Sequence, residues 1–66
     1  MSKTITATYA DAEAIKNVLD DLIGEGIPNE TFYADFETRR VKVIIPATIE
    51  PEITEILRRH DPLEIA

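Results

Sequence analysis

The sequence of 66 residues contains no cysteine and no tryptophan, only one histidine, one serine and two glycines, and few basic residues. Without cysteine, neither a disulfide nor a thiolate metal site can stabilise the fold. This absence also fits a reducing compartment, so we expect a cytoplasmic protein. Seven basic residues against thirteen acidic ones give a formal charge of −6, which disfavours nucleic acid and anionic membrane surfaces as partners.

Long apolar runs are also missing. No stretch approaches the roughly 20 apolar residues of a membrane-spanning helix, and the first residues lack the apolar segment of a signal peptide. A hydrophobic share of 44% is nevertheless ordinary for a folded protein, so we do not expect disorder. A chain this short forms one domain, residues 1–66, and its stability must come from packing or from self-association.

Alternating apolar and polar side chains predict four strands, at residues 4–9, 31–37, 40–45 and 63–65. Thr38 and Arg39 lie between the second and third strands. They are not the Asn-Gly type that favours a two-residue turn, so we expect a loop of three to five residues. The side chains expected on the covered side of the sheet are Ile5, Ala7, Tyr9, Phe32, Ala34, Phe36, Val41, Val43, Ile45, Leu63 and Ile65.

Helical spacing of apolar residues predicts two helices, at residues 11–23 and 49–60. Asp11 is a good N-cap for the first, and Gly24, Gly26 and Pro28 mark its end. Thr48 is the candidate cap of the second, which Asp61 and Pro62 terminate. The two apolar stripes are Ile15, Val18, Leu19, Leu22 and Ile23 in the first helix, and Ile49, Ile53, Ile56 and Leu57 in the second.

This order of elements predicts an α+β protein with a ferredoxin-like two-layer sandwich. Two helices with one apolar stripe each need one face of a sheet to cover, and clean alternation suits an antiparallel sheet whose other face meets water. Right-handed crossovers then give the strand order 4-1-3-2, with a very short fourth strand at one edge and the second strand at the other.

The uncovered face of this sheet is the candidate interaction surface. We expect Tyr33, Ile44, Thr6 and Lys42 there, and an exposed aromatic beside an exposed isoleucine can mark an interface. Scattered apolar residues on a surface are also common, so an ordinary surface is the alternative. Edge pairing through the second strand is another route to a dimer, because Phe32, Tyr33 and Ala34 carry no charge to protect that edge.

The sequence offers no set of catalytic residues, no metal ligands and no cofactor motif. Its one serine is Ser2, at the N-terminus, and its one histidine is His60, which can sense pH or simply cap a helix end. Asp20 and Asp21 are adjacent and therefore point apart on a helix. Arg58 and Arg59 form a basic spot for an anion or a partner's carboxylate, or only compensate the helix dipole.

Four short segments of the chain form a recognisable set. They are Tyr9-Ala10-Asp11-Ala12-Glu13-Ala14, Gly26-Ile27-Pro28, Val41-Lys42-Val43 and Ile56-Leu57-Arg58-Arg59-His60. With these segments the chain resembles small bacterial domains of the heat-induced general stress protein type. The resemblance covers most of the chain, but its motifs are helix caps and core positions, so it implies the fold and no catalytic residue. This sequence departs from the pattern at Asp61, where a glycine commonly follows the histidine.

The leading functional hypothesis is a small non-enzymatic interaction module. It would be a self-associating accessory or regulatory subunit, with a second copy or a larger protein as its partner. One alternative is a sensor of small ligands of the amino-acid-binding type, although the loop Ala10-Asp11 lacks the glycine that such sites use. Another is a small dimeric enzyme, for which Tyr9, Tyr33 and His60 are the candidate residues.

Overall fold

The alternating segments build a four-stranded antiparallel sheet in the computed structural model, which describes residues 2–66. The strands lie in the order β2-β3-β1-β4 across the sheet. The α+β class with two helices is therefore confirmed. The elements are β1 (Ser2–Thr8), α1 (Ala12–Gly24), a 3₁₀ turn η1 (Asn29–Thr31), β2 (Phe32–Asp35), β3 (Arg40–Pro46), a second turn η2 (Ala47–Ile49), α2 (Glu50–Arg58) and β4 (Glu64–Ile65).

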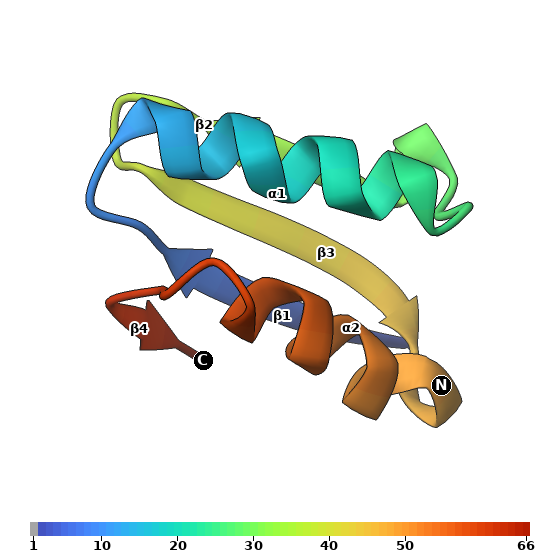
Figure 1. Ribbon diagram of the computed structural model, residues 1–66. Coiled ribbons are helices and arrows are strands. Elements are labelled where there is room, and N and C mark those ends of the chain that lie inside the picture. Colours follow the sequence, from blue (N-terminus) through green and yellow to red (C-terminus); the bar gives the residue numbers. More distant parts are fainter. Residues whose placement is uncertain (1) are drawn as a thin grey trace.

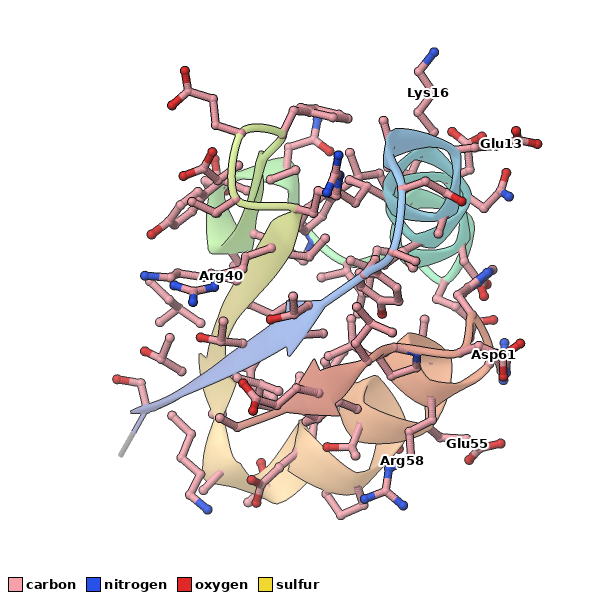
Figure 2. The ribbon with its side chains drawn as sticks, turned by 90° about the vertical axis from the view of Figure 1, so that its left-hand side faces the viewer. Glu13, Lys16, Arg40, Glu55, Arg58 and Asp61 are labelled. Carbon is pink, nitrogen blue, oxygen red and sulfur yellow. The ribbon has the colours of Figure 1, made fainter. Side chains whose placement is uncertain are left out.

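Both helices cover the same face of the sheet, as Figures 1 and 2 show. In Figure 1, α1 lies along the half of the sheet that contains β2 and β3, and α2 lies along the half with β1 and β4. Their apolar stripes meet the inward side chains of the two central strands to form one core. The buried core residues are Ile5, Ala7, Tyr9, Ile15, Val18, Leu22, Val41, Val43, Ile45, Ile53, Ile56 and Leu57.

The ends of α1 follow from two residues that the sequence singles out. Asp11 is extended, and its side-chain oxygen accepts a hydrogen bond from the backbone N–H of Ala14 at 2.9 Å, which satisfies one of the unpaired donors of the first turn. At the other end, Gly26 adopts a left-handed conformation with φ of 84°. Its N–H donates to the carbonyl of Ile23 at 3.0 Å, and Ile27 N–H donates to that of Leu22 at 3.1 Å.

Tyr9 joins the end of β1 to the end of α2. Its side chain is buried, and its hydroxyl donates a hydrogen bond to the carbonyl of Leu57 at 2.7 Å. Burial raises the pKa of the Tyr9 phenol well above its usual range. Tyr9 therefore acts in the structure as a neutral donor that satisfies a carbonyl in the last turn of α2.

The loop between β2 and β3 corrects the prediction for Phe36. It has four residues, 36–39, which confirms the expected length, but β2 stops at Asp35 and Phe36 is 48% exposed. One oxygen of Asp35 accepts hydrogen bonds from the N–H groups of Glu37 and Thr38, at 3.0 and 3.3 Å. This side-chain turn bends the chain directly after Asp35, so the period of two no longer holds at Phe36.

Three other predicted positions are wrong. Ile23 is 55% exposed because it lies at the margin of the α1 stripe, one residue past the buried Leu22. Leu63 is 70% exposed, since the strand pairing of β4 begins only at Glu64. Thr48 lies within η2 and does not cap α2, which begins after Ile49 without a side-chain cap.

Candidate interaction surface

Four of the predicted interface residues share the face of the sheet that no helix covers. The strand register places Tyr33 opposite Lys42, and Lys42 opposite Thr6 on the next strand. Ile44 is two residues from Lys42 on β3, which makes it the diagonal neighbour of Tyr33 and within reach of an aromatic side chain. Tyr33 is 54% exposed and Ile44 46%. The structure therefore brings the two large apolar residues of this face together.

The uncovered face is locally neutral on a strongly acidic molecule. Arg40 stands opposite Asp35 on β2 and opposite Thr8 on β1, and Thr8 stands opposite Glu64 on β4. Figure 2 shows Arg40 pointing away from both helices. With Lys42, the face holds two positive and two negative side chains, so the formal charge of −6 belongs to the rest of the chain. A second acidic molecule meets least electrostatic repulsion here.

Phe32 does not belong to this face. It stands opposite the buried Val43, and its half-buried side chain packs against the core on the helix-covered side. This inward position is the one that the strand alternation predicts. What it offers to a partner is the backbone of β2, which is the last strand on its side of the sheet.

A second feature joins the C-terminal ends of the helices. Asp21 Oδ2 lies 3.0 Å from His60 Nε2 and 3.5 Å from Arg59 Nη1, and the side chains of Asp21 and His60 are each only 23% exposed. A carboxylate is unfavourable near a helix C-terminus, and here a cationic side chain from the other helix compensates it. No local pattern in the sequence predicts this contact, although an acid placed against the helix dipole is a signal that a compensating charge lies nearby.

The two arginines of the expected basic spot have different contacts. Arg59 lies 3.5 Å from Asp21 and 3.8 Å from Glu55. Arg58 lies on α2 beside the segment 61–65, and Figure 2 shows it extending from the outer side of the helix. Within residues 2–66 Arg58 forms no ion pair. The contact of these arginines with an anion or a partner stays a prediction.

A shallow hollow of about 170 Å³ lies between the end of α1 and one side of α2. Ile27, Ile53 and Ile56 line it together with Arg59. The remaining lining residues are acidic, namely Glu25, Glu52 and Glu55. These carboxylates do not converge: the described residues include no group of three or more acidic or histidine side chains that could hold a metal ion.

The residues considered for catalysis lie in three different settings. The Tyr9 hydroxyl is buried and bonded to a backbone carbonyl, whereas Tyr33 is exposed on the sheet. His60 is next to Asp21 at the helix ends.

In the part of the chain that the structure covers, no helix has the length and apolarity needed to cross a membrane. Comparisons with protein-family models, with curated proteins and with solved structures find no match.

Proposed function

We propose that this chain is a small non-enzymatic interaction module with a ferredoxin-like fold, and that it self-associates through its sheet as an accessory or regulatory subunit. The observation that carries the proposal is the exposure of Tyr33 and of its diagonal neighbour Ile44 on the same face of the sheet. They are large apolar side chains on the uncovered face, each about half exposed, and they lie on a locally neutral side of an acidic molecule. Thr6 and Lys42 surround them.

The size of the molecule supports the same proposal. Domains of this length bury only about 60% of the surface of the unfolded chain, so they have little stability to spare. An ordinary interface removes about 800 Å² per partner from water, whereas the whole chain exposes 4354 Å². Pairing two copies would therefore cover a large fraction of the surface of each and stabilise both.

Light scattering coupled to size-exclusion chromatography tests the proposal over roughly 5 to 200 µM protein. We expect the wild-type chain to shift from monomer to dimer in this range, and the Tyr33→Glu variant to remain monomeric because a buried unpaired carboxylate is costly at an interface. Phe36→Glu is the matched control, since it places the same charge at a similarly exposed aromatic position in the adjacent loop.

A wild-type chain that stays monomeric throughout would contradict self-association. Equal weakening by Tyr33→Glu and Phe36→Glu would show that added negative charge, rather than the sheet residue, controls the equilibrium. Circular dichroism of both variants provides the check that each is folded.

A further inference from the structure

We propose that the second copy adds to the outer edge of β2, so that the two β2 strands pair antiparallel across a two-fold axis at Tyr33. The inference rests on the self-association proposed above and specifies its geometry. Two four-stranded sheets would then become one continuous sheet of eight strands, with all four helices on the same side. The partner at this site is a second copy of this chain.

The uncovered face contributes Tyr33, at its β2 margin, to the contact but is too polar to be buried as a whole. Besides Tyr33 and Ile44 it presents three threonines, at positions 4, 6 and 8, together with Arg40 and Lys42. Stacking two such faces would take these hydroxyls and charges out of water, which is unfavourable unless each finds a partner. Pairing at the edge of the sheet leaves them solvated.

The outer edge of β2 is short, at four residues, and it lacks the lysine and proline that usually keep a strand edge from pairing. None of its four residues is lysine or proline, and its one charge, Asp35, stands at the end of the strand. No strand among residues 2–66 pairs with this edge. An edge strand presents unpaired backbone N–H and C=O groups, and an identical strand can satisfy them.

Exposed apolar surface continues from this edge onto α1. Successive residues of a helix are about 100° apart, so Asp21 and Ile23 lie on opposite sides of the buried Leu22. Asp21 faces α2, as its contact with His60 shows, and Ile23 therefore projects toward the β2 edge, over which α1 lies (Figure 1). The 55% exposed Ile23 and the half-buried Phe32 would both be covered by a second copy.

The alternation of side chains restricts the register. Directly opposed residues in an antiparallel pair point to the same face of the sheet. The two-fold axis must therefore pass between a residue and its own copy, because an axis between two consecutive residues would oppose an outward residue to an inward one. With the axis at Tyr33, the Tyr33 residues of the two copies lie opposite one another. Phe32 of each copy then lies opposite Ala34 of the other, so that a large side chain meets a small one. This axis also separates the two Asp35 carboxylates by roughly 14 Å, four residues along a strand, whereas an axis at Ala34 would halve that distance.

Cysteine cross-linking tests this geometry, because the chain contains no cysteine of its own. Mild oxidation of the Tyr33→Cys variant should give a disulfide-linked dimer at least about tenfold faster than the Thr6→Cys control. The opposed Cα atoms of an antiparallel pair are about 4.5–5.5 Å apart, within the range of a disulfide. Ile44→Cys reports the alternative, in which two uncovered faces stack.

Hydrogen exchange of the unaltered chain is a second, independent measurement. We expect the amides of β2 to become at least tenfold better protected as the concentration is raised from the monomeric to the dimeric range, while those of β1 do not change. A dimer in which Ile44→Cys links fastest, or in which β2 gains no protection, overturns the edge geometry but leaves self-association standing. A monomer at all concentrations overturns both.

Discussion

Tyr9 is the residue on which the junction of the two layers depends most directly. Its ring fills the core, and its hydroxyl satisfies the Leu57 carbonyl. The His60 N–H also donates to this carbonyl, but at 3.5 Å, so loss of the Tyr9 hydroxyl leaves the buried carbonyl with only a weak donor. The polar atom of Tyr9 therefore stabilises the fold.

Replacing Tyr9 by phenylalanine removes only this hydroxyl. We expect the free energy of unfolding, measured by urea denaturation, to fall by about 1–2 kcal/mol. Tyr33→Phe is the matched control, because its ring is half exposed and its hydroxyl forms no hydrogen bond within residues 2–66. Its change should stay within about 0.5 kcal/mol. Similar losses in the two variants would contradict the assigned role of Tyr9.

The same residue predicts a loss of stability at alkaline pH. Burial raises the pKa of the folded-state phenol above its ordinary value of about 10, so the folded protein holds this proton more tightly than the unfolded chain. The contribution is complete below pH 10 and is lost as the pH rises above 10, by up to about 1.4 kcal/mol per pH unit. The stability difference between wild type and Tyr9→Phe should therefore shrink from pH 9 to pH 11.5.

At the scale of elements, the two glycines at the end of α1 have different tasks. Gly24 is the last residue of the helix, and a Cβ atom added there would meet no atom within 4 Å. Gly26 has equal space, but its φ of 84° disfavours any side chain. The need for glycine at position 26 is therefore conformational and not a matter of packing.

Alanine substitutions should separate these two tasks. Gly24→Ala should stabilise the protein by about 0.5 kcal/mol, since alanine reduces the entropy of the unfolded chain and favours the helix. Gly26→Ala should destabilise it by about 1 kcal/mol because alanine must adopt the left-handed conformation. Thermal unfolding of both variants checks the opposite signs, and two changes of the same sign would contradict the assignment.

The contact of Asp21 with His60 and Arg59 is the other interaction between elements that can be measured. A double-mutant cycle with Asp21→Ala and His60→Ala should give a coupling free energy of about 0.5–1 kcal/mol, because the pair is partly shielded from water. Asp20→Ala is the control: Asp20 is adjacent and exposed, has no such partner in the described residues, and also opposes the helix dipole. A coupling below about 0.2 kcal/mol would mean that the contact contributes nothing.

At the scale of the whole molecule, the formal charge of −6 predicts how salt affects self-association. Two copies repel one another at long range even if the contact itself is neutral, and salt screens that repulsion over about 10 Å at 0.1 M. We expect dimerisation to strengthen when sodium chloride is raised from about 20 to 300 mM, measured by sedimentation equilibrium. Dimerisation that weakens with salt would indicate that attraction between opposite charges holds the copies together.

Most of the fold could be predicted from local signals. The caps of α1, the position of β3 and the length of the loop after β2 follow from Asp11, Gly26, the alternation of residues 41–45 and the absence of an Asn-Gly turn. Phe36, Ile23 and Leu63 could not be placed in this way. Each stands at the end of an element, where the direction of the chain depends on a side-chain turn or on the neighbour it meets.

The candidate surface was likewise predictable only in part. Alternation alone places Tyr33, Ile44, Thr6 and Lys42 on one face, because a strand has a side-chain period of two. The inward position of Phe32 was already implied by the same alternation. The partnership of Asp21 with His60 was not, since these residues are far apart in the sequence and meet only where α1 and α2 pack side by side on the sheet (Figure 1).

The sequence by itself determined the class of the protein, its two helices, its alternating strands and its acidic charge, because these depend on periodicity, caps and composition. The tertiary structure decided which apolar side chains remain exposed, which carboxylate is compensated and which strand stands unpaired at the edge. Those properties depend on what lies opposite each residue across the sheet or between the helices. No local pattern carries that information, since the opposing residue comes from a distant part of the chain.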